Sequence, residues 1–448
     1  MDICNLNFDH ELSLENLPAL ISSFCASTIS VFDKHAPFIS KTITDKPKTK
    51  TLSTATSNLK LERNKAYAEY KKTNTLEAQT ELQRLNKQVK YGIYKDTKDN
   101  FNTVVESKGI HFAANKLCKL GKKTDGNFYF APDTINDYFV AVSCISDLPD
   151  PISFPKKPSP IHTPTNSFSL VPVSRWDVLK AWHTMKKATS TSHDTMGLCP
   201  NMINLTISAP NINEVIVNIV QLCMMSGVVP ESLKSSKVIP LAKVKCPSGP
   251  NQLRPIAIQP ILSKLIERCV YKQLIEFLNS NNVLSDRQFG FRAKHSTVHA
   301  QLALTDHFYR EIDNNNICIL VSLDLSKAFD KVNRELLLHK FAWYNIGTHW
   351  FESYLNQRSQ HVSINGKVSQ TKFTNTGVAQ GSLLGPILFA LLINDLPLHL
   401  QEAFSIMFVY DTNFSLSGSP KLVTDLLARV VKCIESVDGI EPFTVKPG

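Results

Sequence analysis

The chain has 448 residues, of which 43% are hydrophobic and 20% are charged, and it carries a formal net charge of +10 at pH 7. These values describe an ordinary globular protein, long enough for two or three domains and at least one large core, and exclude a low-complexity chain. The basic balance favours a polyanionic partner, either nucleic acid or an anionic membrane.

The cysteines and the chain start exclude several further classes. The ten cysteines stand singly, with no C-x-x-C pair to indicate a zinc site, and the acidic N-terminus does not resemble a signal peptide. The most apolar run, Leu383 to Ile393, is too short to cross a bilayer. We therefore expect an intracellular protein, in the cytoplasm or the nucleus, without a membrane partner.

Residues 1–146 are predicted to be a helical, basic connector region. Apolar spacing predicts a helix within residues 1–40, one long helix or a helical pair over about 58–100, and a shorter helix near 110–120. Residues 41–100 hold 14 Lys and Arg against 7 Asp and Glu. This excess indicates either a phosphate-binding surface or a solvated helical face.

Residues 147–172 contain seven prolines and almost no periodicity, which predicts an extended linker and a domain boundary. Beyond it, residues 173–448 alternate helix and strand signals. Ser174 and Ser263 are predicted to cap helices, Val215–Met225 is an apolar helix, and Lys237–Leu241 is a short strand. The order of these signals, without a regular βαβ repeat, predicts an α+β domain.

Two carboxylates end apolar strand-like runs. The first run, Cys318 to Asp324, reads as a buried strand, with a helix expected to begin near Ser326. The second, Ser405 to Leu416, reads as a hairpin with Asp411 in its turn. Together, Asp324 and Asp411 would hold divalent cations; singly, each is equally consistent with a helix cap or a turn residue.

A glycine-rich segment, Gly377-Val-Ala-Gln-Gly-Ser-Leu-Leu-Gly-Pro386, lies between these two and precedes an apolar helix at Ile387–Ile393. Its glycines allow close backbone approach to a flat or charged ligand, and Gln380 can hydrogen-bond to a base or sugar. A glycine-rich turn alone is a weak signal, but its position between two carboxylate motifs strengthens it.

These three segments, in this order and spacing, resemble motifs A, B and C of a reverse transcriptase palm. Their residue patterns are similar to those of jockey-like non-LTR retrotransposons. Supporting segments resemble the family over about Pro172 to Phe414, among them Leu253–Ile258 and Gln288-Phe-Gly-Phe-Arg292. The resemblance implies a right-hand fingers and palm fold, with an antiparallel palm sheet packed on helices. Intron-encoded and telomerase-type polymerases are the alternative within the same enzyme class.

The resemblance also implies roles for individual residues. Asp324 and Asp411 would bind two Mg²⁺ ions, or Mn²⁺, with help from the Leu325 carbonyl. Lys243 and Arg254 would hold the incoming triphosphate, and Phe329 would exclude a ribose 2′ hydroxyl. Gln380 and Gly381 would line the templating base pair. The implied partners are an RNA template, a DNA primer and dNTPs.

Three departures from the family pattern are present, of which Tyr410 and the missing thumb favour a second function, whereas the change at Ala379 is expected to be tolerated. The family reads F-A-D-D where this chain reads Phe408-Val-Tyr-Asp411, so Tyr410 replaces a metal-binding aspartate. Ala379 replaces a proline in the glycine-rich segment, and the end of the chain at Gly448 predicts that the thumb is absent. The alternatives are an RNA-directed DNA polymerase and a catalytically impaired, nucleic-acid-binding remnant of one.

Overall fold

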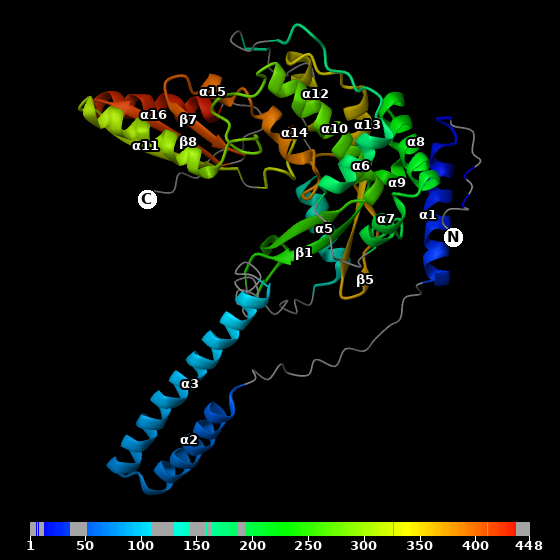
Figure 1. Cartoon of the computed structure of the whole chain (residues 1–448). Helices are drawn as coiled ribbons and strands as arrows, with labels where there is room; N and C mark the ends of the chain where they lie inside the picture. The colour runs from blue at the N-terminus through cyan, green and yellow to red at the C-terminus, as the bar shows by residue number, and fades with distance from the viewer. Residues whose placement is uncertain are drawn as a thin grey trace. The chain divides into compact units, whose positions relative to one another are not determined.

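The structure is a computed structural model of the whole chain (Figure 1). It describes residues 6, 8, 13–35, 52–108, 130–143, 157–158, 163–185, 193–244, 246–325, 327–409 and 411–435. At residues 97, 100–105, 107–108, 324 and 431–435 it describes the backbone alone.

The chain divides into two compact units, one formed by residues 1–37 with 128–448 and the other by residues 38–127. The smaller unit is a helical hairpin of α2 (Thr54–Thr73) and α3 (Leu76–Lys108). Its reversal is made by Asn74, which adopts a left-handed φ of 46° and donates its N–H to the Tyr70 carbonyl. Of the two alternatives expected over about 58–100, one long helix or a helical pair, the structure has the pair.

The larger unit contains two sheets. The first has the order β2-β1-β4-β5, with β6 also paired to β4. Strands β1 and β2 are antiparallel, whereas β1 and β4 are parallel. Helix α5 (Pro132–Val142) packs on β4. The strand bounds are β1 Ser235–Ala242, β2 Leu253–Ile258, β4 Arg358–Ile364, β5 Lys367–Val368 and β6 Lys372–Thr374.

The second sheet is antiparallel, with the order β3-β8-β7. It consists of β3 (Ile317–Asp324), β7 (Phe404–Phe408) and β8 (Asp411–Gly418). Helices α11 (Thr297–Asp313) and α16 (Pro420–Glu435) pack on it (Figure 1). The hairpin expected over 405–416 is confirmed. The expectation that Cys318–Asp324 is buried was wrong, because β3 is an edge strand and Leu320 is 45% exposed.

One apolar core joins the remaining helices of this unit to the β3-β8-β7 sheet. The most apolar helices lie deepest: Ile216 and Ile219 of α8 and Leu388 of α14 are fully buried. The helices are α1 Leu17–His35, α6 Arg175–Thr184, α7 Pro200–Thr206, α8 Pro210–Ser226, α9 Glu231–Lys234, α10 Ile261–Ser280, α12 Arg334–Trp343, α13 His349–Leu355, α14 Gly385–Leu392 and α15 Leu396–His399; η4, Pro250–Gln252, is a 3₁₀ turn.

This mixture of helices and sheets confirms the α+β prediction. Among the described helices, none is long and apolar enough to cross a membrane. The cap predicted at Ser174 is confirmed, because Ser174 and Asp177 form a reciprocal capping box at the start of α6. The cap predicted at Ser263 was wrong. Helix α10 begins at Ile261, and the Asp194 carboxylate accepts from the Ile261 N–H at 2.8 Å.

Two other expectations differ from the structure in ways that affect the site. No helix begins near Ser326; residues 327–331 form a turn, and α12 begins at Arg334 after an Asn333 cap. The compact units also differ from the boundary predicted at 147–172, because α1 and α5 of the expected connector region pack within the larger unit. The helix expected near 110–120 and most of the expected linker lie outside the described residues.

Candidate functional site

The two predicted metal-binding aspartates meet at one end of the β3-β8-β7 sheet. Asp324 and Asp411 are register partners across the antiparallel β3–β8 pair. Partners of this kind have Cα atoms about 4.5–5.5 Å apart. The pairing of two strands 87 positions apart therefore brings both aspartates to one point, as the order of the motifs implied.

Oxygen donors of this kind suit a hard divalent cation, so the donor chemistry fits Mg²⁺ or Mn²⁺. Within the described residues, no three His, Cys, Asp or Glu side chains gather into a metal cluster. The third anionic donor of the family pattern would stand at Tyr410, which lies outside the described residues. The structure therefore brings two aspartate positions together, and Leu325 is the residue that follows Asp324.

A short segment beside β7 holds the turn that carries Asp411. Residues 287–289 run along β7, where Phe289 donates its N–H to the Met407 carbonyl and Met407 donates to the Arg287 carbonyl, both at 2.8 Å. The Gln288 side chain is fully buried, and its Oε1 accepts from the N–H groups of Gly290 at 2.9 Å and Val409 at 3.1 Å. Val409 has a left-handed φ of 64°, so this amide stabilises a strained turn.

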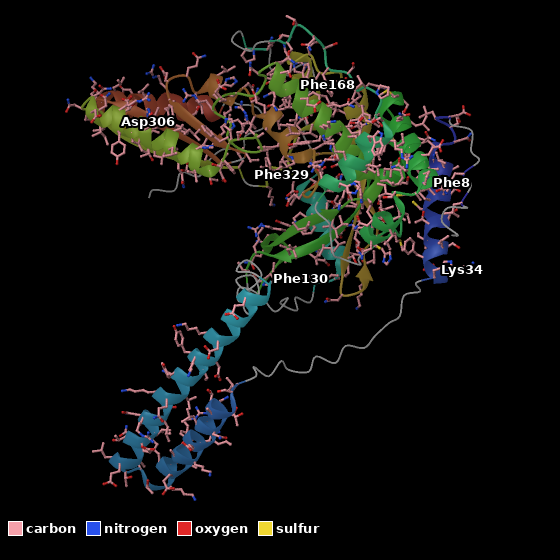
Figure 2. All side chains as sticks on the ribbon, viewed as in Figure 1. Phe8, Lys34, Phe130, Phe168, Asp306 and Phe329 are labelled. Carbon is pink, nitrogen blue, oxygen red and sulfur yellow. The ribbon has the colours of Figure 1, made fainter. Side chains whose placement is uncertain are left out.

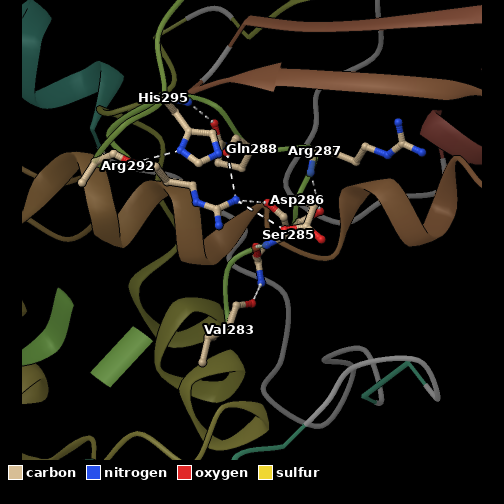
Figure 3. Close-up of polar contacts among 10 residues, drawn as sticks. Val283, Ser285, Asp286, Arg287, Gln288, Arg292 and His295 are labelled. Carbon is tan, nitrogen blue, oxygen red and sulfur yellow. Dashed lines mark hydrogen bonds and ion pairs between the residues drawn. The ribbon is translucent and has the colours of Figure 1, made fainter. Parts of the chain in front are cut away.

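Arg292, near the end of the same segment, contacts residues at its start (Figure 3). The Arg292 guanidinium donates to the carbonyls of Ser285 at 2.8 Å and Gln288 at 3.3 Å, and it lies 3.9 Å from the Asp286 carboxylate. The His295 ring packs edge-on against Phe289. These contacts fix the conformation of the 285–295 loop. The loop in turn positions the buried Gln288 side chain, which accepts from the Val409 N–H.

Gly290 makes this contact possible, which leads to a testable prediction. A Cβ added at residue 290 would lie 2.6 Å from the Val409 nitrogen and 2.4 Å from its Cγ2. Because a backbone atom cannot move as a flexible side chain can, Gly290→Ala should lower the free energy of unfolding by about 1–3 kcal/mol. Thermal denaturation measures the effect.

Gly249→Ala is the matched control, since its added Cβ meets only the movable Asn251 side-chain oxygen at 2.9 Å. Equal melting temperatures for the two variants would contradict the packing described for Gly290.

A pocket of about 550 Å³ collects most of the predicted nucleotide-binding residues, although its described lining includes neither Asp324 nor Asp411. Strands β1 and β2 supply the wall with Arg254, and Lys243 follows β1 directly. Leu325, directly after Asp324, also lines it. The predicted residues in the lining are Lys243, Arg254, Leu325, Phe329 and Gln380. Figure 2 labels Phe329 in this part of the structure.

The glycine-rich segment presses against β2 beside the pocket. Ala257 donates its N–H to the Gln380 carbonyl at 2.8 Å. Gly381 has a φ of +121°, and an added Cβ would lie 2.7 Å from the Ala257 carbonyl oxygen. Residue 381 must therefore be glycine for this approach, although Gly381 itself stands just outside the pocket lining.

Asp330 orients the Gln380 side chain. The Gln380 Nε2 donates to both carboxylate oxygens of Asp330 at 3.0 Å, which leaves the amide oxygen as the group able to accept from a ligand. Burial raises the pKa of the Asp330 carboxyl, while the Gln380 hydrogen bonds and the ammonium groups of Lys327 and Lys243 oppose that change. The pocket therefore combines a carboxylate with several cationic groups.

Glu267, on α10, anchors the other end of the glycine-rich segment. Its side chain is fully buried, and its Oε2 accepts from the Leu383 N–H at 2.7 Å. Its Oε1 accepts from the Gln259 amide and the Tyr354 hydroxyl, each at 2.6 Å. One buried carboxylate thus links α10, α13 and the residues that follow Gln380.

Helix α5 forms a wall of the pocket that sequence reasoning missed. Tyr138, Phe139 and Val142 of α5 line the pocket, and the Lys327 ammonium lies 4.9 Å from the Tyr138 ring centroid. The Ser143 carbonyl accepts from the Thr376 N–H at 3.1 Å. Proline at the start of α5 and apolar residues at i, i+4 spacing were signals for the helix, but nothing local indicated where it packs.

Comparisons with known proteins show which sequences this chain resembles. Residues 242–438 match the family model described as reverse transcriptase (RNA-dependent DNA polymerase). The chain is 33% identical over 175 residues to the probable RNA-directed DNA polymerase from transposon BS of Drosophila melanogaster. It is 31% identical over 176 residues to the RNA-directed DNA polymerase from mobile element jockey of the same species.

A more distant similarity, 27% over 208 residues, is to the retrovirus-related Pol polyprotein from type-1 retrotransposable element R2 of Popillia japonica. The first two alignments cover 38% and 39% of this chain, and each spans 19% of the relative. The similarity therefore lies in about a fifth of the length of those relatives.

Proposed function

We propose that this chain carries out RNA-templated DNA synthesis. The premise is that residues 242–438 match the reverse transcriptase family and are similar to its jockey-like non-LTR members. The observation that carries the proposal is the register pairing of Asp324 with Asp411, with Leu325, the residue after Asp324, in the pocket lining. In this proposal the β3-β8-β7 sheet is the palm, and β1 with β2 belongs to the fingers.

The residues of the pocket would bind and orient the substrates. Lys243 and Arg254 would hold the triphosphate of an incoming dNTP by charge-assisted hydrogen bonds. Phe329 would stand where a ribose 2′ hydroxyl must be excluded, and Gln380 with Gly381 would contact the templating base pair. The RNA template and the DNA primer would approach the same pocket.

Asp324 and Asp411, with the Leu325 carbonyl, are the groups that would hold Mg²⁺ or Mn²⁺ at the primer terminus. When bound, two such ions would lower the pKa of the primer 3′ hydroxyl and neutralise charge on the leaving pyrophosphate. The part played by the chain is to hold the two aspartates in register, which the Gln288 contact to Val409 supports.

A second candidate function is favoured by one position. Tyr410 supplies a neutral phenol where the family pattern has a carboxylate, which favours a nucleic-acid-binding remnant with little or no catalysis. Both candidates share the pocket and its partners, so they differ in chemistry rather than in binding.

The nucleotide-binding part of the proposal is tested by the double variant Lys243→Ala, Arg254→Ala. Each lost charge-assisted contact should weaken dNTP binding by about 1.5–3 kcal/mol, so the double variant should bind at least a hundredfold more weakly. The measurement is the dNTP concentration that stabilises a complex with an RNA template and a chain-terminated primer.

Lys237→Ala is the control, because Lys237 lies on β1 but does not line the pocket. Unchanged dNTP binding in the double variant would sink the assignment of this pocket to the triphosphate.

A further inference from the structure

One face of α3, in the helical hairpin, combines lysines with exposed tyrosines. We call the side chains Lys87, Lys90, Tyr91, Tyr94, Lys95 and Lys98 the α3 face. Their spacing of three and four residues places them on one side of the helix, and all six are exposed. Figure 2 shows side chains projecting along this helix.

The acidic residues nearest this face, Asp96 and Asp99, lie along the groove between α3 and the start of α2. Asp96 is the acidic residue within 87–98, and it faces the start of α2, where its carboxylate accepts from the Ser53 N–H at 2.9 Å. Leu85 and Val89 also point away, into the contact with α2, and are buried. The α3 face therefore presents four ammonium groups over roughly 16 Å of helix.

The two tyrosines distinguish this face from an ordinary solvated helix. Tyr91 is 69% exposed and Tyr94 is 64% exposed, although large aromatic side chains usually bury most of their surface. Lys87, Tyr91 and Lys95 also line a groove of about 730 Å³ between α3 and the start of α2, together with Asp96 and Asp99. Ammonium groups interleaved with exposed rings form the combination that holds single-stranded nucleic acid, by phosphate pairing and base stacking.

We propose that the α3 face binds single-stranded RNA without sequence preference, with its lysines on phosphates and its tyrosines stacked on bases. A membrane surface is the competing partner for a basic helix. The exposed side of α3 from 87 to 98 carries no Leu, Ile, Phe or Trp, which a helix lying in a bilayer interface needs. The proposal does not depend on the polymerase pocket, since the face belongs to the other compact unit.

The test compares full-length chains binding a labelled 20-nucleotide RNA by fluorescence anisotropy over a series of salt concentrations. Converting Lys87, Lys90, Lys95 and Lys98 to Gln should weaken binding at least tenfold. It should also reduce the slope of log affinity against log salt by roughly 3, since each phosphate contact contributes about 0.7 for a single strand. Tyr91→Ala with Tyr94→Ala should weaken binding by about thirtyfold or more with the slope unchanged.

The matched control changes four exposed lysines of α2, Lys60, Lys65, Lys71 and Lys72, to Gln, with the same loss of charge on the same hairpin. Equal weakening by both quadruple variants would overturn the proposal in favour of a general charge effect. If the variant with the four α3-face lysines changed to Gln retains RNA binding but no longer sediments with vesicles containing anionic lipid, the proposal is overturned in favour of a membrane. Circular dichroism checks that the helices persist. Lys237→Ala, which changes neither the α3 face nor the pocket lining, should keep full RNA affinity.

Discussion

Replacing Tyr410 with aspartate is expected to raise primer extension on an RNA template by roughly a thousandfold. A phenol is neutral near pH 7, with a reference pKa of ~10, so it is a poor ligand for Mg²⁺. Restoring a carboxylate next to Asp411 would add a third anionic donor to the pair formed with Asp324. Several kcal/mol of transition-state stabilisation correspond to about three powers of ten in rate.

The measurement is single-turnover extension of a DNA primer by the full chain and its variants. Tyr410→Phe is the matched control, since it removes only the hydroxyl and should leave extension near background. Adding Asp324→Asn to the Tyr410→Asp chain should abolish the gain. Strong extension by the unmodified chain would refute the view that position 410 limits catalysis.

Much of the fold was predictable where the signals are local. The Ser174 capping box, the helical pair and the 405–416 hairpin each depend on residues within a few positions of one another. The start of α10 was not predictable in this way, because its cap comes from Asp194, 67 positions earlier in the chain. The exposure of β3 likewise depends on which strands lie beside it, and apolar content alone does not reveal an edge strand.

The residues of the candidate site also fall into those that local motifs indicate and those that depend on contacts distant in the chain. Lys243, Arg254, Phe329 and Gln380 were identified by their motifs, and the structure brings them to one pocket. The residues that hold those motifs in place were missed. Gln288 contacts Val409 across 121 positions and Glu267 contacts Leu383 across 116, so only the folded chain reveals either role.

Among these long-range contacts, we expect the loss of those made by Glu267 to lower the free energy of unfolding most. Glu267→Ala would leave the Leu383 N–H, the Gln259 amide and the Tyr354 hydroxyl without their acceptor. Burial raises the pKa of Tyr354, so its hydroxyl keeps its proton and remains a donor. Each buried donor left unsatisfied costs about 1–3 kcal/mol, and we expect about 3–5 kcal/mol in total, a fall in melting temperature of roughly 4–7 °C.

Glu276→Ala is the control, because Glu276 is an exposed glutamate on the same helix and its loss should change stability by less than about 0.5 kcal/mol. Glu267→Gln should fall between the two, since an amide keeps one acceptor oxygen but cannot serve all three donors. If the Glu267→Ala variant has the same melting temperature as the Glu276→Ala variant, the buried carboxylate does not anchor the glycine-rich segment. If it melts far lower while Glu267→Gln recovers part of the loss, the hydrogen bonds to this carboxylate, rather than its volume, hold Leu383 and the preceding Gln380 against β2.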